Sequence, residues 1–350
     1  MSSSNTKPDF DRFLAAVTRK GLPDRLPVAE IEVDADIMEA FLGHPIANLE
    51  QHAGFWRSAG YDYALLYVRG QPLPDHFFQT KIGQRHEELE AGTHSRSTFE
   101  VELGVKDERT FEAYPWIGPD EVYYRDVDGI RPFLPDGMKL VVNQGPLFSG
   151  IWRLMGLETF SVACVENPSL VKAVAEKMGE LCVDIARNLL QREWVGAYWL
   201  GDDMAYTTGL MVSPDFLRTY VFPYYQRIGQ LARQYRKPFL LHSDGKLTQV
   251  FEDILQCGVT AIHPNEPTSV NLVDLKRQYG ERLSFLGGMD VDLLGRGTVA
   301  EIKLAVRRLI ETVAPGGGFA LGSGNSVPKY VPVENYRAML DAVKEFGNVY

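Results

Sequence analysis

Two histidines in the second half of the chain follow short apolar runs, at points where buried strands would end. His242 comes directly after Pro238-Phe-Leu-Leu and is followed by Ser243-Asp244-Gly245, and His263 ends the next apolar run. An imidazole in such a place can act as a base, an acid or a metal ligand. We therefore predict that His242 and Asp244 belong to a functional site, with His263 beside them.

Other polar residues follow the remaining apolar runs of the chain. Arg69 and Asp203 are expected to join the catalytic group. Adjacent residues of a strand face opposite sides, so one member of the Asp202-Asp203 pair is expected to be structural. Asp34 and Asp290 have an alternative role as helix N-caps. The residues expected to bind substrate are Glu30, Glu32, Asn143, His263, Glu266, Asp290, Ser323 and Asn325.

Eight β-rich runs alternate with amphipathic helical segments. This alternation predicts an α/β fold in the form of a (β/α)₈ TIM barrel, in which the carboxyl ends of the strands share one rim. A doubly wound open sheet is the alternative, but no Gly-x-Gly-x-x-Gly follows the first run. The runs are Leu26–Val33, Tyr61–Val68, Met138–Gln144, Val195–Gly201, Pro238–His242, Thr260–His263, Leu283–Gly287 and Gly318–Gly322.

Apolar residues spaced three and four apart predict the helices between these runs. The segment Phe10–Lys20 is expected to close the bottom of the barrel, and Ser213-Pro214 is a typical helix start. Further helices are predicted over Ser169–Arg192, Thr298–Val313 and Val333–Phe346.

The segment Gly70–Gly137 fits neither the strand period nor the helix period. We expect one domain over residues 1–350, with residues 70–137 as an insertion at the barrel mouth after the second strand. Its aromatic residues would pack either a flat substrate or the insertion itself onto the barrel. They include Phe77, Phe78, Tyr114 and Trp116.

The composition excludes several classes of protein. The chain has 350 residues and a formal charge of −10, which argues against nucleic acid as a partner. Its three cysteines are far apart, which suits a reducing cytoplasm rather than a disulfide framework. No secretory signal or apolar run of membrane-spanning length is visible, so we expect no membrane association and a cytoplasmic location.

The C-terminal half carries motifs of a known family. Leu240-Leu-His-Ser-Asp-Gly245, Gly287-Gly-Met-Asp290 and Gly316-Gly-Gly-Phe-Ala-Leu-Gly-Ser-Gly-Asn325 resemble the uroporphyrinogen decarboxylase superfamily. The resemblance implies a (β/α)₈ barrel. It also implies relatives that are zinc-dependent methyltransferases and pass methyl groups to or from corrinoid proteins or coenzyme M. Members often form dimers, and the acidic composition does not oppose a homodimer.

The chain departs from the decarboxylases of this superfamily at four functional positions. Aligning Pro27-Val28 with the family motif puts Glu32 and Asp36 where an arginine pair grips substrate carboxylates, which reverses the charge. The run Gly60-Tyr-Asp-Tyr-Ala64 matches the motif before the catalytic aspartate, and Arg69 falls at that aspartate. The family tyrosine falls near Trp152 or Arg153, and the family histidine falls on Ser323. Decarboxylation of uroporphyrinogen is therefore not expected.

The chain also departs from the zinc site of the methyltransferases. Their His-x-Cys motif corresponds to His242-Ser-Asp244, and Ser323 lies near the position of their last cysteine ligand. A metal would then be held by His242, Asp244 and a carboxylate such as Glu30 or Glu32. Zinc accepts oxygen ligands, and such a site also suits manganese or iron.

Three functions remain open. The first is a methyltransferase that demethylates a small methoxylated or methylamine-type substrate for a corrinoid protein, with Arg69 steadying an anionic substituent. The second is a decarboxylase or lyase for a small non-porphyrin acid, in which Arg69 holds the carboxylate and His242 or Asp203 donates a proton. The third is a barrel that only binds a ligand, which the cost of burying so many ionisable groups disfavours.

Overall fold

The computed structural model describes residues 7–68, 104–122 and 124–348. Its parallel strands are β1 Tyr63–Tyr67, β2 Lys139–Gln144, β3 Val195–Gly201, β6 Phe239–His242, β7 Ala261–His263, β8 Ser284–Met289 and β9 Phe319–Ser323, and a small hairpin is made by β4 Ala205–Tyr206 and β5 Gly209–Leu210. The α-helices are α1 Phe10–Thr18, α2 Ala35–Leu42, α3 Leu49–Ala59, α6 Glu108–Ala113, α7 Arg125–Gly129, α8 Phe148–Met155, α9 Leu157–Glu166, α10 Pro168–Leu190, α11 Pro214–Tyr220, α12 Phe222–Gln234, α13 Phe251–Gln256, α14 Leu272–Tyr279, α15 Val291–Arg296, α16 Val299–Val313 and α17 Val333–Phe346. Short 3₁₀ turns lie at Pro119–Glu121, Arg131–Phe133 and Thr248–Val250.

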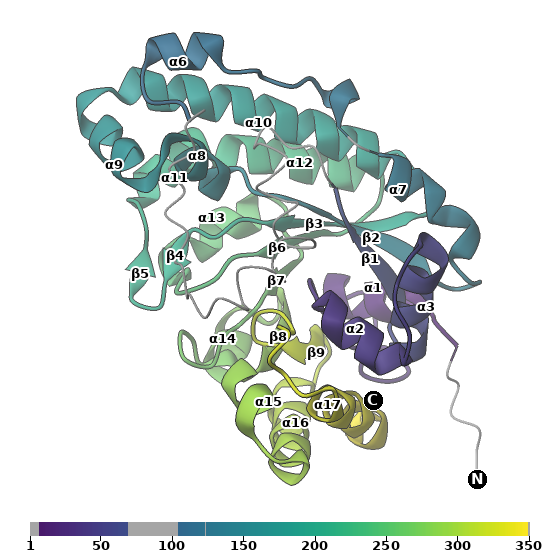
Figure 1. The fold of residues 1–350 in the computed structure, drawn as a ribbon. Helices are drawn as coiled ribbons and strands as arrows, with labels where there is room; N and C mark the ends of the chain where they lie inside the picture. Colours follow the sequence, from purple (N-terminus) through teal and green to yellow (C-terminus); the bar gives the residue numbers. More distant parts are fainter. Residues whose placement is uncertain (1–6, 69–103, 123, 349–350) are drawn as a thin grey trace.

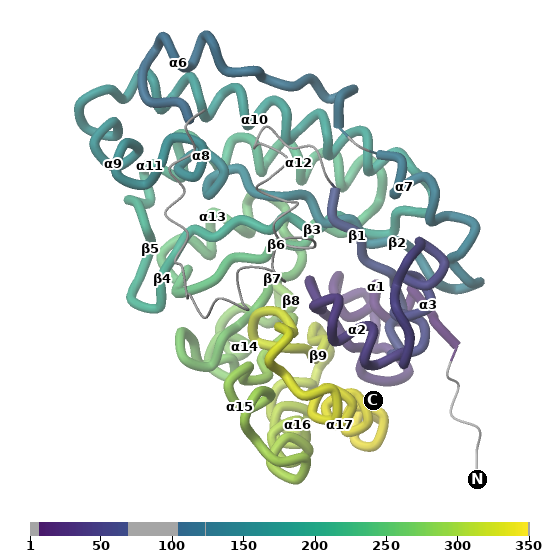
Figure 2. The backbone as a smooth tube through the Cα atoms, in the orientation of Figure 1, coloured from purple at the N-terminus to yellow at the C-terminus, as the bar shows by residue number. Residues whose placement is uncertain are grey.

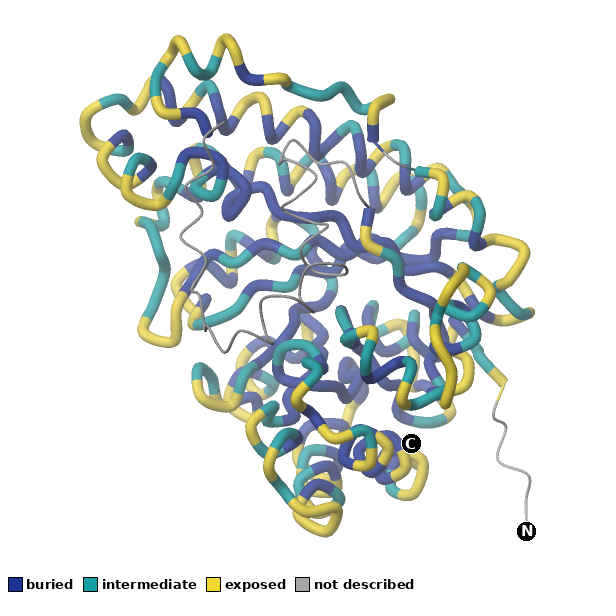
Figure 3. The backbone as a smooth tube through the Cα atoms, in the orientation of Figure 1, coloured by how far each residue is buried: buried dark blue, intermediate teal, exposed yellow. Residues whose placement is uncertain are grey.

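The seven parallel strands form one curled sheet in the order β1-β2-β3-β6-β7-β8-β9. This order follows the chain, as in a barrel, whereas a doubly wound open sheet reverses its order part-way. The helices lie outside the curl (Figure 1). The strands are buried and the outer turns of the helices are exposed (Figure 3). The barrel-type α/β fold is thus confirmed, and the carboxyl ends of the strands share one rim, called the barrel mouth below.

The predicted first strand, Leu26–Val33, is wrong as a continuous strand. It forms only two isolated bridges to the C-terminal part, Val28 to Leu321 and Val33 to Val327. On its other side, the Tyr63 hydroxyl accepts a hydrogen bond from the Glu30 amide at 2.8 Å and donates one to the Glu30 carbonyl at 2.7 Å. A side chain from β1 therefore satisfies backbone groups that a strand ladder would otherwise pair.

The N-terminal helix α1 lies where the sequence predicts the bottom of the barrel. The Phe13 ring packs on the Tyr63 ring with centroids 4.6 Å apart. Arg12 Nη1 donates to Asp62 Oδ1 at 2.5 Å, and both side chains are buried. Near the other end of the chain, α17 lies beside α2 (Figure 2).

The described part of the predicted insertion, residues 104–137 without 123, contains α6 and α7 and lies along α10 on the outside of the sheet (Figure 1). Asn167 donates to Glu108, and the Trp194 indole donates to the Val127 carbonyl. The Tyr114 and Trp116 rings pack on one another at 4.8 Å. These two aromatics therefore pack the segment itself, while Phe77 and Phe78 lie outside the described residues.

Among the described residues, none of the helices combines the length and the apolar character needed to cross a membrane.

Replacing Tyr63 with Phe tests whether its hydroxyl stabilises the junction between Glu30 and β1. The variant leaves a buried amide and a buried carbonyl unpaired, so we expect the free energy of unfolding to fall by about 1–3 kcal/mol. Urea denaturation measures this loss. Tyr330→Phe, at a residue that is 65% exposed, is the control and should be unchanged; equal stability of both variants would contradict the assignment.

Candidate active site and metal-binding group

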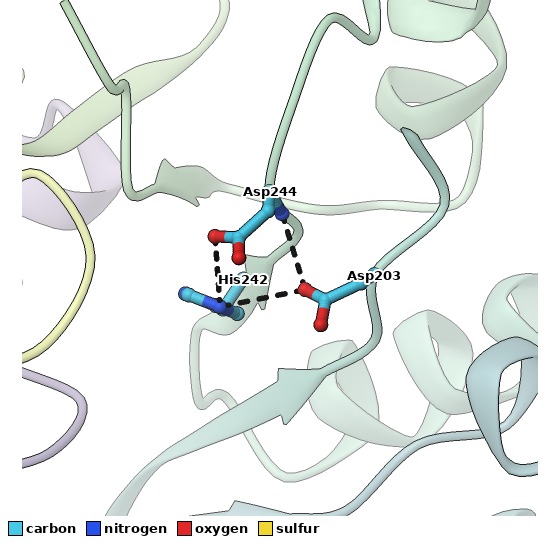
Figure 4. A group of neighbouring side chains, drawn as sticks. All are labelled: Asp203, His242 and Asp244. Carbon is cyan, nitrogen blue, oxygen red and sulfur yellow. Dashed lines mark hydrogen bonds and ion pairs between the residues drawn. The ribbon is translucent and has the colours of Figure 1, made fainter. Parts of the chain in front are cut away.

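Three side chains meet at the barrel mouth: Asp203 after β3, His242 at the end of β6, and Asp244 two residues later. One donor atom from each lies within 4.8 Å of the others. His242 Nε2 is 3.5 Å from Asp203 Oδ1 and 3.4 Å from Asp244 Oδ1. Figure 4 shows both carboxylates directed toward the imidazole. All three residues are half-buried.

A second imidazole fixes the ring of His242. His242 Nδ1 and His263 Nδ1 are 2.7 Å apart, so one of them carries the hydrogen and the other accepts it. Burial, and then the nearby His242, hold the pKa of His263 well below its usual range. His263 is therefore neutral, and His242 is free to carry a proton or bind a cation through Nε2, which faces the carboxylates.

Asp244 lies in a network that controls its charge. Asn325 Nδ2 donates to its two carboxylate oxygens at 2.9 and 3.0 Å, and lies 3.3 Å from Glu266 Oε1. Burial raises the pKa of Asp244 to about 6; the nearby carboxylates of Asp203 and Glu266 also raise it, while His242 and Asn325 lower it. The acid is therefore held close to the point where it changes charge near neutral pH.

The adjacent pair Asp202 and Asp203 divides as the sequence predicts. Asp202 is buried and accepts hydrogen bonds from the backbone amides of Leu147, Phe148 and Ser149 at 2.7–3.1 Å, and from the Tyr225 hydroxyl at 2.6 Å. It thus satisfies the free amides at the start of α8. Asp203 faces the mouth instead, and its Oδ1 accepts from the Asp244 amide at 3.2 Å.

The spacing of the three side chains suits a divalent metal. Two donor atoms bound tetrahedrally to the same zinc at about 2.1 Å lie about 3.4 Å apart. The two nitrogen-to-oxygen distances at His242 match this value and are too long for good hydrogen bonds. One nitrogen and two carboxylate oxygens would also bind manganese or iron. The residues present therefore fit a metal, through a donor set without thiolate.

The structure places the other predicted metal ligands elsewhere. Glu32 is not in the three-residue group; its carboxylate accepts a hydrogen bond from the Tyr67 hydroxyl at 3.1 Å. Glu30 is fully buried. Its Oε1 accepts a hydrogen bond from the Ser323 amide at 2.6 Å, and its Oε2 accepts one from the Ser323 hydroxyl at 2.5 Å. Among the described residues, Asp203 supplies the second carboxylate beside His242, and the same carboxylate accepts a hydrogen bond from the Asp244 amide.

The remaining predicted residues have separate roles. Asp290 caps α15 by accepting from the amides of Asp292 and Leu293, as the N-cap alternative expects, and its contact with substrate stays a prediction. Asp34 likewise caps α2. Asn143 is buried at the end of β2. Arg69 lies outside the described residues. Arg153 was not among the predicted site residues, yet its Nη2 lies 3.9 Å from Asp203 Oδ2.

Comparison with known proteins places the chain in a family. The family model described as Uroporphyrinogen decarboxylase (URO-D) matches residues 121–346, well over half of the chain. The chain belongs to the uroporphyrinogen decarboxylase family. The recognition made from the C-terminal motifs is thus confirmed.

Curated members of the family match over shorter segments. Uroporphyrinogen decarboxylase of Actinobacillus succinogenes is 32% identical over 99 residues, which are 28% of this chain and 27% of that protein. The enzyme of Thioalkalivibrio sulfidiphilus is 26% identical over 145 residues, 40% of each chain. The matched segments thus span less than half of these relatives.

A solved structure matches over nearly the whole length. A methyltransferase from Methanosarcina mazei superposes with a TM-score of 0.68 at 17% identity, covering 96% of this chain and 98% of that one. At this identity the match establishes a shared fold.

Metal binding by this protein should depend on Asp203, His242 and Asp244. We expect zinc or manganese to bind the wild type, and His242→Ala or Asp203→Asn to weaken binding by more than the roughly 10–100-fold typical of outer-shell changes. Titration calorimetry with the metal salt measures this. Glu32→Gln is the matched control and should bind as the wild type does. Equal binding by all four proteins would place the metal elsewhere.

The buried acid Glu30 should make stability depend on pH. Burial outweighs its hydrogen bonds to Ser323 and raises its pKa to about 8 from an ordinary 4.5. The folded state therefore keeps a proton that the unfolded state releases, so this contribution to stability is full below about pH 4.5 and is lost as the pH rises toward 8. Glu30→Gln cannot ionise, and its stability relative to wild type should rise by a few kcal/mol, in order of magnitude, from pH 5 to pH 8.

Urea denaturation at the two pH values measures this change. Glu334→Gln, at an exposed position, is the control and should follow the wild type. A constant difference between Glu30→Gln and wild type across the range would show that Glu30 is ionised in the folded protein.

Proposed function

We propose that this protein is a methyltransferase that demethylates a small methoxylated or methylamine-type substrate and passes the methyl group to a corrinoid carried by a partner protein. The observation that carries the proposal is the group of Asp203, His242 and Asp244 at the barrel mouth. In this proposal, a second protein's cofactor would approach the substrate at the same mouth. The shared fold with a methyltransferase supports the same reading.

The charge of the site favours a neutral or cationic methyl donor. Asp203 and Asp244 lie beside His242. Glu266 lies beside Asn325, which holds the Asp244 carboxylate. A methylamine-type cation is attracted to such a site where no metal balances Asp203 and Asp244, and a neutral methoxy group enters it without repulsion in either case. A polycarboxylate is repelled, and Glu32 and Asp36 add to that repulsion where decarboxylases carry arginines. Decarboxylation of uroporphyrinogen therefore remains disfavoured.

Each side chain has a defined task in this proposal. His242, Asp203 and Asp244 would hold a zinc, manganese or iron ion, which when bound stabilises negative charge on the leaving oxygen or nitrogen. His263 orients the His242 ring, and Asn325 holds the Asp244 carboxylate. The bonding electron pair stays with the leaving atom, which then takes up a proton from water.

One observation also favours a second function, a decarboxylase or lyase for a small acid. Arg153 approaches Asp203 at 3.9 Å and is placed to contact a carboxylate at the mouth. Asp244 or His242 would then donate the proton that replaces carbon dioxide.

Methyl transfer can be tested without the natural partner by using free cob(I)alamin as acceptor. Purified protein loaded with zinc or manganese is incubated with single methoxylated phenols or methylated amines, and methylcobalamin is followed by absorbance. We expect transfer with at least one donor, and a loss of about 10²–10⁴-fold in His242→Ala because the leaving group is no longer stabilised. Glu32→Gln should retain activity. Release of carbon dioxide from a small acid, without methyl transfer from any donor, would instead establish the lyase.

A further inference from the structure

Asn143 is a buried amide whose side-chain atoms have no hydrogen-bond partner in the part of the chain that the structure describes. It is 1% exposed, and both Nδ2 and Oδ1 lack a partner. The next residue, Gln144, faces the helices and is satisfied: its Nε2 donates to the Cys182 carbonyl at 3.3 Å, and its Oε1 accepts from the Tyr198 hydroxyl at 2.6 Å. Unpaired buried amides are costly and rare in native proteins. Asn143 therefore calls for a partner that the described residues do not supply.

Trp199 presents a second unpaired group on the same face. Asn143 and Trp199 are partners in the register of β2 and β3, so their side chains point to the same side of the sheet. The Trp199 ring meets the His263 ring edge-on at 5.3 Å, which places this face inside the barrel, below His242. Its indole Nε1 is buried and also lacks a partner.

Gly201 leaves space over the Asn143 amide. It lies two residues after Trp199 and so faces the same side. A Cβ at Gly201 would be 3.5 Å from Asn143 Oδ1 and 3.9 Å from Nδ2, which is ordinary contact distance. The missing side chain leaves room for a small group beside the buried amide, next to the half-buried Gly201.

We propose that Asn143, Trp199 and Gly201 form a substrate subsite for an uncharged group that both donates and accepts hydrogen bonds, such as a hydroxyl. Nδ2 of Asn143 and Nε1 of Trp199 donate to its oxygen, and Oδ1 of Asn143 accepts its hydrogen. A carboxylate has no hydrogen for Oδ1 and is repelled by Asp203 and Asp244. This deepens the proposed function and rests on it in one respect: the methyl donor carries a free hydroxyl beside its methylated oxygen.

Stability measurements test the inference without any ligand. Asn143→Leu keeps the shape and removes two unpaired groups, so the ligand-free variant should be as stable as wild type or more stable in urea denaturation. Gln144→Leu is the matched control, and it should lower the denaturation midpoint because Tyr198 and Cys182 lose their partner. A fall in midpoint for Asn143→Leu as large as that for Gln144→Leu would show that Asn143 has a structural partner and would overturn the inference.

Binding measurements test the chemistry of the ligand. The probes are 2-methoxyphenol and 1,2-dimethoxybenzene, which differ by one free hydroxyl, and calorimetry gives both dissociation constants in the absence of corrinoid. We expect wild type to prefer 2-methoxyphenol by about tenfold or more, since an analogue without the hydroxyl leaves buried groups unpaired. Asn143→Leu should remove this preference. Gly201→Ala should weaken 2-methoxyphenol binding by filling the space over the amide, with no loss of stability.

Equal binding of the two probes by wild type, binding of neither, or a preference that survives in Asn143→Leu would each overturn the subsite. These outcomes differ from failure of the proposed function. Preferential binding through Asn143 without methyl transfer to cob(I)alamin would retain the subsite and remove the methyltransferase. Methyl transfer at an unchanged rate in Asn143→Leu would retain the methyltransferase and remove the subsite.

Discussion

The contact between two imidazoles determines what this site can do. His263 is buried and held neutral, and its Nδ1 lies 2.7 Å from Nδ1 of His242. Because one ring nitrogen of His242 is committed to this contact, the other is directed at Asp203 and Asp244. The partner is a neutral imidazole rather than a carboxylate, so the carboxylates beside His242 are those that face Nε2. A cation at that point, whether proton or metal, is what balances the two acids.

The backbone supplies this arrangement through two adjacent aspartates that act in opposite directions. Asp202 binds the free amides at the start of α8 and fixes the end of β3. With that residue held, Asp203 can turn only toward the mouth, where the Asp244 amide meets it. The buried carboxylate of Asp202 thus helps to position the half-buried carboxylate of Asp203. The same division explains why burial raises the pKa of Asp202 without giving it a place at the mouth.

Sequence patterns predict the strands well because most of them are buried runs bounded by polar residues; Val195–Gly201 matches β3 at both ends. They fail for Leu26–Val33, where the apolar pattern is present but Tyr63 replaces the strand ladder on one side. They also identify His242 and Asp244 but favour Glu32 as the third ligand. Strand order predicts that a carboxylate lies at the rim. The direction in which its side chain points depends on loop contacts, such as the hydrogen bond from the Asp244 amide to Asp203. The lack of partners at Asn143 is likewise invisible in a sequence, because the neighbouring Gln144 has the same chemistry and is satisfied.

The names of the relatives suggest a substrate with several carboxylates, whereas the acidic side chains at the barrel mouth disfavour one. The curated relatives are named as decarboxylases of a porphyrinogen, yet in the described part of this barrel mouth Asp203 and Asp244 lie beside the half-buried imidazole of His242. Binding a polycarboxylate there would require cations to outnumber Asp203, Asp244 and Glu266, and Arg153 is already engaged with Asp203. A fold fixes where a site lies, while the residues on its rim decide what enters. Under the proposed function, an acidic rim above an interior amide that has no partner among the described residues would select a small donor without negative charge, such as a methyl ether or a methylamine.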